Sequence, residues 1–503
     1  MNKYSVLNNE FNPSIKKIHI AKEKLIPKNY GSFWELISKE YELKISFSVL
    51  KKFSFLLNYD TFKGLTLIVY NNRIIDIQFD DTTNKLYGAA VDIGTTSVVI
   101  YLCDLVSNKL IGTYSSLNSQ NPYGTDAFSR LQHTINTSNG LNELQEEIIS
   151  TINKLLIQAN NDLNDISSNL YNIVLCGNSI MQHLFLGLSP KENSPFVNIT
   201  NDFVILYANE LNLHTNSNCV ITFLPLLGGF AGSDTTSVLL SITEDYKNRL
   251  IVDLGTSSEI AIGNIDSYFV ASAACRPVFE GTCIEFGMRG TAGAIKKVSI
   301  SENNVHLKVV EDIKPKGICG SGLIDIIAEL LKMNIIDKTG SMLNRIEYVS
   351  KFPKRSIGER IESINGDKAF IIAYKNETFY NKDIYITQKD IRKIQLGKGF
   401  IYTGCIILLK KYGIKVKDLD EILISGAFCN YIDIDKAKYI GLIPDIPNVP
   451  VKSIGNGAGK GVQMYLSNRN LTEKCERIVN NTTHIELTSD YDFQNEYILN
   501  INF

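Results

Sequence analysis

The sequence lacks the features that mark secreted, membrane-spanning and nucleic-acid-binding proteins. Its N-terminus, MNKYSVLNNEFNPS, has no apolar stretch of signal-peptide length, and no apolar run approaches the roughly 18 residues of a membrane span. Lys plus Arg (51) nearly balances Asp plus Glu (53), so the net charge of −2 gives no broad basic field for nucleic acid or anionic lipid. We therefore expect a cytoplasmic protein that binds neither nucleic acid nor a membrane.

Cysteine pairs are also missing. The nine cysteines are scattered without any CxxC motif, at positions 103, 176, 219, 275, 283, 319, 405, 429 and 475. This spacing does not predict a disulfide framework or a zinc site, and it lacks the thiolate spacings of an iron–sulfur domain. We expect most of these thiols to be buried, and we expect no iron–sulfur cluster in this chain.

The length and the apolar content predict a multi-domain globular protein. A chain of 503 residues, 44% of them hydrophobic, suits roughly three domains of about 150 residues. Residues 1–86 predict a small α/β domain: helices in SFWELISKEY and SFSVLKKFSFLLN precede two β-rich runs joined by Asn71 and Asn72, which suit a tight hairpin. Residues 87–248 predict a first α/β lobe, and residues 249–503 a second lobe with a C-terminal tail.

An internal repeat links the two predicted lobes. AVDIGTTSVVIYL, from Ala90, aligns with IVDLGTSSEIAIG, from Ile251, and the shared positions include an Asp at the end of an apolar strand and the Gly that follows it. Each copy predicts a strand, a Gly-hydroxyl-hydroxyl turn and a returning strand. Two unrelated hairpins with small turn residues are the alternative.

The turn of each copy suits a phosphate group. Glycine lets the backbone approach a ligand closely, and successive N–H and hydroxyl groups converge on one place. Asp92 and Asp253 would repel bare polyphosphate, so the pair predicts Mg²⁺, held through water, together with ATP. A turn-capping carboxylate is the alternative for either Asp alone. The predicted phosphate contacts are Gly94, Thr95, Thr96, Gly255, Thr256 and Ser257.

Other predicted nucleotide contacts follow later in the chain. The strand in DEILISGAFCNYI ends at Gly426, Ala427 and Phe428, which fit a loop passing over adenine and ribose. A long helix with Thr387 as its N-cap carries Gln395 and Lys398, which either reach the nucleoside or lie on a solvated helix face.

Three glycine-rich segments supply further candidates. Gly320 begins a helix whose free N–H groups favour an anion, although close helix packing explains it equally well. Asn178 follows a strand and is placed to face the γ-phosphate. Asp234, beyond a run of glycines, either orients the attacking water, as a third catalytic residue beside Asp92 and Asp253, or caps a helix.

These loops resemble the actin, Hsp70 and sugar-kinase class, a ribonuclease H-like two-lobed ATPase (ASKHA) fold. A longer series of motifs is similar to one branch of it, the reductive activators of corrinoid proteins. The series runs from about residue 20 to the C-terminus as YGAAVDIGTTS, NPYGTDAFSRL, GNSIMQHLFLGLSP, LPLLGGFAGSDT, VDLGTSSEI, FEGTCIEFGMRG, GICGSGLIDIIAELL, TQKDIRKIQLGKG and ISGAFCNYID. Together they are far more specific than one phosphate loop.

The resemblance implies an ATPase that drives the one-electron reduction of an inactive Co(II) corrinoid to Co(I) in a methyltransferase system. Members of the family with this activity carry an iron–sulfur domain, so here the electrons are expected from a separate ferredoxin-like donor. A homodimer remains open. The alternatives are a small-molecule kinase with Asp234 as base, a non-catalytic ATP-gated partner-binding protein, and an activator of 2-hydroxyacyl-CoA dehydratases, which requires a cluster between subunits.

Overall fold

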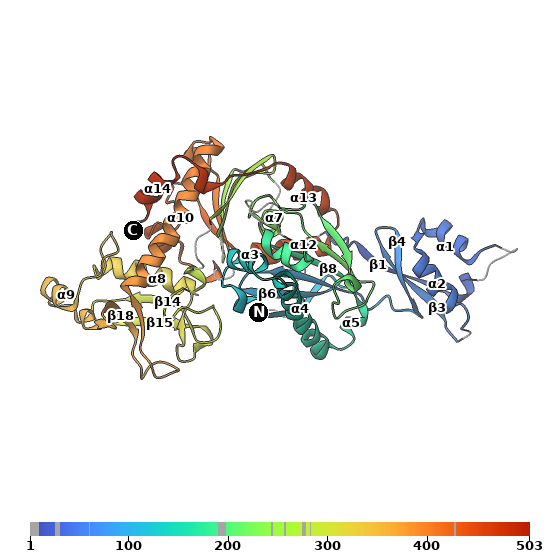
Figure 1. Cartoon of the computed structure of the whole chain (residues 1–503), viewed down its shortest axis with the longest axis horizontal. Coiled ribbons are helices and arrows are strands. Elements are labelled where there is room, and N and C mark those ends of the chain that lie inside the picture. The colour runs from blue at the N-terminus through green and yellow to red at the C-terminus, as the bar shows by residue number, and fades with distance from the viewer. Residues whose placement is uncertain are drawn as a thin grey trace. The chain divides into compact units, whose positions relative to one another are not determined.

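The computed structural model describes residues 10–25, 31–59, 61–189, 198–242, 245–255, 258–273, 278–281, 283–426 and 429–503 (Figure 1). The chain forms two compact units. Unit 1 comprises Met1–Leu226, Gly232–Ser241 and Ala458–Glu476, and unit 2 comprises Leu227–Ala231, Ile242–Gly457 and Arg477–Phe503. The division differs from the predicted domains in two ways. The predicted N-terminal domain falls within unit 1, and Ala458–Glu476, which was predicted to belong to the second lobe, is also part of unit 1.

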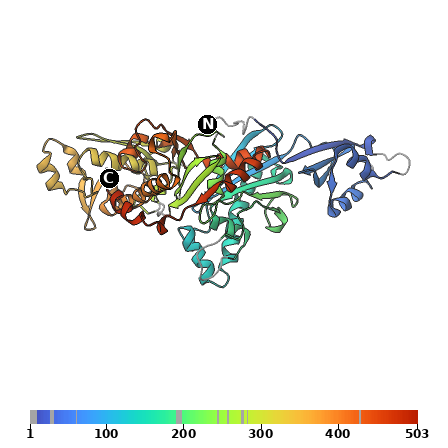
Figure 2. The same cartoon turned by 90° about the horizontal axis from the view of Figure 1, so that it is seen from above.

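Unit 1 begins with a small sheet covered on one face by two helices (Figures 1 and 2). Apolar residues of both helices, including Ile37 and Phe53, form a core with Leu65, Leu67 and Val69 of the sheet. The strand order is β1-β3-β4-β2. The elements are β1 (Ile15–Ala21), α1 (Phe33–Tyr41), β2 (Lys44–Ile45), α2 (Phe47–Leu56), β3 (Gly64–Tyr70) and β4 (Arg73–Phe79).

The hairpin between β3 and β4 turns at the predicted asparagines. Asn71 and Asn72 have φ of 46° and 63°, the left-handed conformation that Asn tolerates and that a two-residue hairpin requires. Buried Asp76 of β4 accepts a hydrogen bond of 2.7 Å from the hydroxyl of Tyr171, and Lys17 donates one of 2.9 Å to Asn169. These long-range bonds hold the small sheet against the rest of unit 1.

The main sheet of unit 1 has six strands in the order β7-β6-β5-β8-β10-β9. Strands β5, β6 and β7 form an antiparallel meander, and β8 pairs with β5 in parallel. Four successive residues of β5, Gly88–Val91, are buried, so both faces of the strand are covered at this point, which explains the apolar run before Asp92. The strands are β5 (Tyr87–Ile93), β6 (Ser97–Asp104), β7 (Lys109–Leu117), β8 (Leu170–Gly177), β9 (Val204–Tyr207) and β10 (Val220–Phe223).

Helices pack around this sheet, among them a late segment of the chain. The helices are α3 (Ala127–Asn136), α4 (Gly140–Leu163), α5 (Ile166–Asn169), α6 (Ser179–Leu186), α7 (Ser233–Leu240), α12 (Gly457–Ser467) and α13 (Leu471–Asn480). In α12, a Cβ on Gly461 would lie 1.8 Å from the carbonyl oxygen of Ser237, so only glycine permits this approach to α7. The hydroxyl of Ser237 also donates a 2.6 Å hydrogen bond to the carbonyl of Ala458. This close contact explains why Ala458–Glu476 belongs to unit 1.

Unit 2 repeats the same sheet pattern. In the order β21-β20-β11-β12-β13-β22, strands β11, β12 and β13 form an antiparallel meander, and β20 pairs with β11 in parallel. The strands are β11 (Arg249–Leu254), β12 (Ser258–Asn264), β13 (Ser267–Ala273), β20 (Glu421–Ser425), β21 (Val451–Gly455) and β22 (Thr482–His484). The predicted duplication therefore extends from one hairpin to four strands of each sheet.

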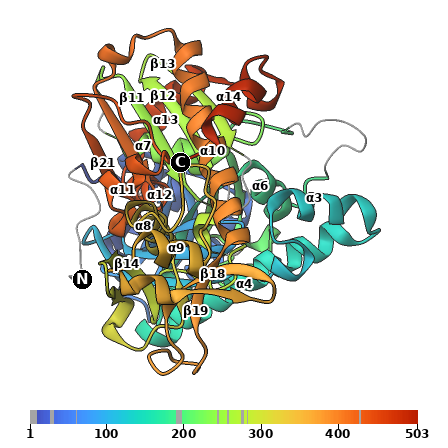
Figure 3. The ribbon, with the colours of Figure 1, turned by 90° about the vertical axis from the view of Figure 1, so that its left-hand side faces the viewer.

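Two three-stranded sheets and five helices complete unit 2. The strands are β14 (Ala294–Ile300), β15 (Val305–Val309), β16 (Gly317–Ile318), β17 (Ile361–Ile364), β18 (Asp367–Ala373) and β19 (Ile384–Thr387), and the helices are α8 (Gly320–Lys332), α9 (Arg345–Lys351), α10 (Gln388–Tyr412), α11 (Ile434–Tyr439) and α14 (Phe493–Asn500). Thr387 is the N-cap of α10, as predicted, in a capping box with Asp390. Helix α14 lies alongside α10 (Figure 3).

Candidate functional site

The first candidate loop connects β5 to β6 at the middle of the unit 1 sheet. Asp92 is half-buried on β5, paired in register with Val99 on one side and Cys176 on the other. A Cβ on Gly94 would lie 2.7 Å from the carbonyl oxygen of Ser97, so the turn requires glycine. The loop is thus a tight backbone turn that carries a carboxylate on the strand leading into it.

Asn178 holds the side chain of Thr95. As N-cap of α6, its side-chain oxygen accepts from the N–H of Met181 at 3.0 Å, and its amide nitrogen donates to Thr95 Oγ1 at 2.9 Å. Thr95 and Asn178 are both buried. Because the hydroxyl of Thr95 accepts from Asn178, its own proton is oriented away from that amide and can be donated to an anion.

The backbone of the loop is held by residues that follow β7. The Asn118 side chain donates to the carbonyl of Gly94 at 3.0 Å, and its backbone N–H donates to that of Thr96 at 3.0 Å. Arg130 of α3 donates to the carbonyl of Thr95 at 2.5 Å. The carbonyls of Gly94, Thr95 and Thr96 therefore each accept a hydrogen bond. Because each peptide group is planar, this fixes the direction of the N–H groups that follow them.

Asp234 lies in the first turn of α7, beside the start of α6. A Cβ on Gly232 would lie 2.3 Å from Asn178 Cα, so the two segments touch through their backbones. The hydroxyl of Ser233 accepts from the N–H of Gly177 and donates to its carbonyl, both at 3.1 Å. The carboxylate of Asp234 accepts from the N–H of Thr235 at 2.8 Å, and Gly232 is the N-cap of the helix. Of the predicted residues, Asn178 thus contacts Thr95 directly, and Asp234 lies two residues after Gly232, which packs against Asn178.

The second candidate loop follows β11 in unit 2. Asp253 is half-buried and pairs in register with Glu259 and with Ser425 of the parallel strand β20, the same topological position as Asp92. Gly255 is described, whereas Thr256 and Ser257 lie outside the described residues. The pKa of the Cys429 thiol is raised well above its usual value by burial and by the charge of Asp253, so this thiol stays protonated.

Gly426 adjoins the strand that leads into the second loop. It follows β20 with φ of 132°, and a Cβ on it would lie 2.3 Å from the carbonyl oxygen of Leu254. Both the conformation and the space therefore require glycine. Ala427 and Phe428 lie outside the described residues.

Gln395 and Lys398 are buried on α10, so the solvated helix face considered for them is wrong. Gln395 donates to the carbonyl of Thr339 at 3.0 Å. The Lys398 ammonium donates to the carbonyl of Asn502 and lies 5.6 Å from the ring centre of Phe503. Burial lowers the pKa of Lys398 to about 8. The C-terminal segment therefore covers both side chains in this structure.

Gly320 is the first residue of α8. Gly322, two residues later, packs closely against the neighbouring strand. A Cβ on Gly322 would lie 2.3 Å from the carbonyl oxygen of Ile295, so the helix lies directly on β14. The Ser321 hydroxyl donates to the carbonyl of Lys296 at 2.9 Å. Close helix packing thus accounts for Gly322, while the N–H groups of the first turn remain the feature on which the anion prediction for Gly320 rests.

Comparison with known proteins assigns the chain to a family. A family model described as the C-terminal domain of RACo, the ASKHA domain, matches residues 247–503, and one described as the RACo middle region matches residues 87–245. The corrinoid activation enzyme RamQ of Eubacterium limosum is 43% identical over 460 residues, 91% of this chain and 77% of that protein. The chain belongs to the RACo family.

Two further relatives agree with this RACo assignment. A Methanosarcina barkeri protein named as the Co(II) methylated amine-specific corrinoid protein reductase is 25% identical over 456 residues, 83% of this chain and 77% of that one. A solved structure of a reductive activator for corrinoid, iron–sulfur protein superposes with a TM-score of 0.89 and 29% identity, covering 98% of this chain and 80% of that chain. The predicted ASKHA fold and the predicted family are confirmed.

The eight cysteines that the structure describes in this RACo family member form no metal-binding cluster. Of the eight that the structure describes, seven are buried and Cys283 is partly exposed, and all eight are free thiols. Within the described ranges, no group of three or more His, Cys, Asp or Glu side chains is placed to hold a metal ion. The same ranges contain no helix long and apolar enough to cross a membrane.

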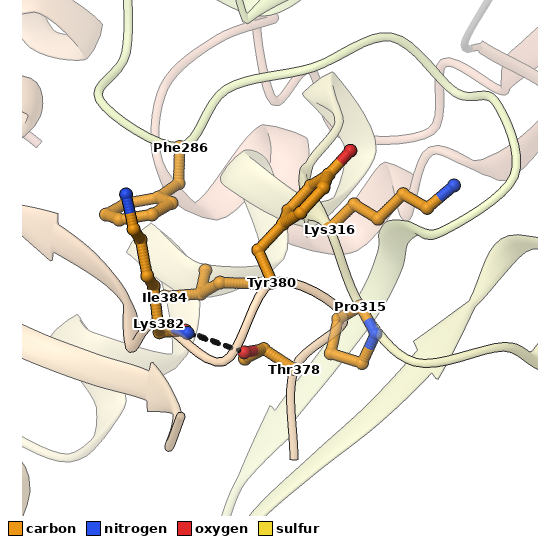
Figure 4. Close-up of a pocket in the computed structure, with 7 residues that line it drawn as sticks. All are labelled: Phe286, Pro315, Lys316, Thr378, Tyr380, Lys382 and Ile384. Atoms are coloured by element: carbon orange, nitrogen blue, oxygen red, sulfur yellow. Dashed lines mark hydrogen bonds between the residues drawn. The ribbon is translucent and has the colours of Figure 1, made fainter. Parts of the chain in front are cut away.

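A surface cavity of about 330 Å³ lies elsewhere in unit 2 (Figure 4). It is lined by Phe286, Pro315, Lys316, Thr378, Tyr380, Lys382 and Ile384. Among the described residues, none of those predicted to contact nucleotide lines it. Sequence reasoning did not single out Asn118, Arg130 or Ser233, although Arg130 lies in the motif NPYGTDAFSRL and Ser233 in LPLLGGFAGSDT.

Proposed function

We propose that this chain is a cytoplasmic ATPase that activates a corrinoid protein of a methyltransferase system, returning Co(II) to Co(I) with electrons from a separate donor. The observation that carries the proposal is the duplicated strand-Asp-Gly loop, present once in each unit at the same position of its sheet. The relatives support the choice of substrate, because two of them are named for corrinoid activation or corrinoid protein reduction.

The residues of both loops fit Mg-ATP. Carboxylates at strand ends are hard oxygen donors for Mg²⁺, and we assign Asp92 and Asp253 to it. Glycine in each turn lets the backbone approach a phosphate closely, and the hydroxyl proton of Thr95 is available as a donor because Asn178 donates to its oxygen. When bound, Mg²⁺ neutralises phosphate charge and polarises the bond to be broken.

The side chains of the chain bind and orient the reactants. We assign Asp234 to hold the attacking water, since its helix begins in contact with Asn178. Water then forms the new bond to the γ-phosphorus while the bond to the bridging oxygen breaks, and ADP and inorganic phosphate leave. In the reduction, one electron passes from the donor to Co(II), which gives Co(I) and the oxidised donor.

This reduction requires a moderate differential binding energy from the nucleotide. Inverting a two-state equilibrium from about 1:99 to 99:1 takes roughly 5.5 kcal/mol of differential binding. At about 59 mV per tenfold change for one electron, that ratio corresponds to roughly 240 mV. We propose that ATP stabilises a complex with the corrinoid protein in which the cobalt has lost an axial ligand and is easier to reduce.

A separate electron donor is proposed from the cysteines. The described thiols are scattered and mostly buried, whereas an iron–sulfur cluster requires several thiolates in one place. A ferredoxin-like protein would supply the electron at a low potential. In an assay of Co(I) formation, we expect such a donor in its reduced form to replace the chemical reductant.

The test is anaerobic absorption spectroscopy of a Co(II) corrinoid protein mixed with this chain, a strong one-electron reductant and Mg-ATP. We expect the Co(I) spectrum to appear with ATP and not with ADP, and ATP hydrolysis to rise when the corrinoid protein is added. Co(I) formation that does not depend on ATP would contradict the proposal. Labelled phosphate found on a metabolite, and not in water as inorganic phosphate, would identify a kinase.

Asn178→Ala tests the contact between α6 and the first loop. The variant loses an N-cap, which costs about 1 kcal/mol, and it frees the hydroxyl of Thr95, so we expect Mg-ATP to bind roughly tenfold more weakly. Asn344→Ala is the matched control, because Asn344 is the N-cap of α9 and accepts from the N–H of Glu347 at 2.8 Å. Calorimetric titration and thermal melting of both variants measure the two effects. Equal nucleotide affinities would remove Asn178 from the site.

A further inference from the structure

Arg130 is a completely buried cation in contact with the first loop. It is 0% exposed, and its guanidinium donates to four oxygens. The acceptors are the carbonyl of Gly124 at 3.0 Å, Gln120 Oε1 at 2.9 Å, Asn121 Oδ1 at 2.7 Å and the carbonyl of Thr95 at 2.5 Å. Such a planar fork holds several acceptors in a fixed geometry, which a lysine ammonium cannot reproduce.

No carboxylate neutralises this charge by direct contact. Among the described residues Arg130 forms no ion pair, and the nearby Asp126 accepts from the N–H of Ser129 at 2.8 Å as the N-cap of α3. Burial lowers the pKa of Arg130 to about 10, so it remains protonated at neutral pH. Burying a charge without a counter-ion is costly, so a purely structural role would be served better by an apolar residue.

The Arg130 guanidinium is placed to polarise a peptide group of the first loop. It donates to the carbonyl of Thr95, and the N–H of that same peptide group belongs to Thr96. A cation on the carbonyl polarises the peptide and strengthens its N–H as a donor. Through Asn121, whose amide donates to the carbonyl of Thr96 at 3.4 Å, the same network reaches the next peptide.

We propose that Arg130 is a positioning residue of the phosphate-binding loop, which fixes the Thr95–Thr96 peptide and polarises it toward the phosphates. The inference rests on the proposed function, since it names the residue that prepares the first loop for Mg-ATP. Arg130 itself contacts the loop through the carbonyl of Thr95 and is not assigned a contact with the nucleotide.

The test compares Arg130→Met and Arg130→Lys by calorimetric titration with Mg-ATP. Arg130→Met removes all of these hydrogen bonds, and Arg130→Lys keeps the charge but not the fork that reaches four acceptors, so we expect the dissociation constant to rise about 10- to 100-fold in both while the number of sites stays near that of the wild type. A variant that is merely unfolded would show fewer sites with unchanged affinity, and that result would overturn the inference. Wild-type affinity in Arg130→Lys would also overturn it, because positive charge alone would then suffice.

Arg360→Met is the matched control. Arg360 donates to the carbonyls of Ile371 at 3.1 Å and Ile372 at 3.2 Å in unit 2, so it also holds backbone groups by charged donors, and it contacts no predicted nucleotide residue. We expect its Mg-ATP affinity to equal that of the wild type. A loss as large as that of Arg130→Met would show a non-specific effect and contradict the assignment.

Hydrogen exchange separates this inference from the proposed function. In the nucleotide-free protein, the amides of residues 94–97 should exchange at least about tenfold faster in Arg130→Met, because the loop loses its anchor. Unchanged exchange there would overturn the inference even if Mg-ATP binds. If the wild type binds no Mg-ATP, the proposed function fails, and faster exchange would still support Arg130 as the anchor of this loop.

Discussion

Asp92→Asn is expected to lower ATP hydrolysis and Co(I) formation by at least about 100-fold. Asparagine has nearly the same shape, so β5 should keep its pairing with β6 and β8 and the protein should remain folded. What disappears is the negative charge to which we assign Mg²⁺. Steady-state release of inorganic phosphate, measured with the corrinoid protein present, checks the prediction.

Asp202→Asn is the control for this substitution. Asp202 is an exposed residue of the same unit and is not among the predicted site residues, so the same chemical change there should leave hydrolysis at the wild-type rate. Asp253→Asn should behave like Asp92→Asn, because both carboxylates occupy the same position of their sheets. Hydrolysis within about threefold of wild type in Asp92→Asn would contradict the assigned role and favour the turn-capping explanation.

The fold was predictable where its signals are local. The strand-Asp-Gly pattern, the Asn71–Asn72 hairpin and the N-cap of α10 each depend on a few neighbouring residues with specific conformational preferences. The repeat added more, because a duplicated pattern implies a duplicated supersecondary structure. Consequently the sheet positions of Asp92 and Asp253 agree with what their sequence contexts indicated.

The contacts that complete the candidate site were not predictable in the same way. Ser237 and Ala458 are 221 residues apart, and the glycine that allows them to meet resembles any other helical glycine in the sequence. Arg130 lies 35 residues from Thr95 in an ordinary amphipathic helix. A sequence pattern indicates which face of a helix is buried, but not which distant backbone carbonyl its polar groups will meet.

The burial of Lys398 also could not be predicted from its sequence neighbours. Its helical position fits both a solvated face and a ligand contact, and the structure covers it with Asn502 and Phe503. The energetic reason lies in the C-terminal helix, since Phe400 packs against Phe493 at a ring distance of 4.8 Å. Tertiary packing of α14 on α10 therefore decides the environment of a residue whose own sequence neighbours leave it undetermined.

Gly232→Ala is expected to damage both stability and nucleotide binding, because the added Cβ would lie 2.3 Å from Asn178 Cα and 2.4 Å from the carbonyl oxygen of Gly177. Both clashing atoms are backbone, so α7 must move away from α6, and overpacking of this kind costs about 1–3 kcal/mol. We expect the melting temperature to fall by about 5 °C or more and ATP hydrolysis to fall with it, since Asn178 and Asp234 would separate. Gly290→Ala is the control, as a Cβ there meets nothing within 4 Å. Thermal melting and phosphate release measured on both variants decide the matter: a Gly232→Ala protein that melts and hydrolyses like Gly290→Ala would show that α6 and α7 need not touch for the site to work.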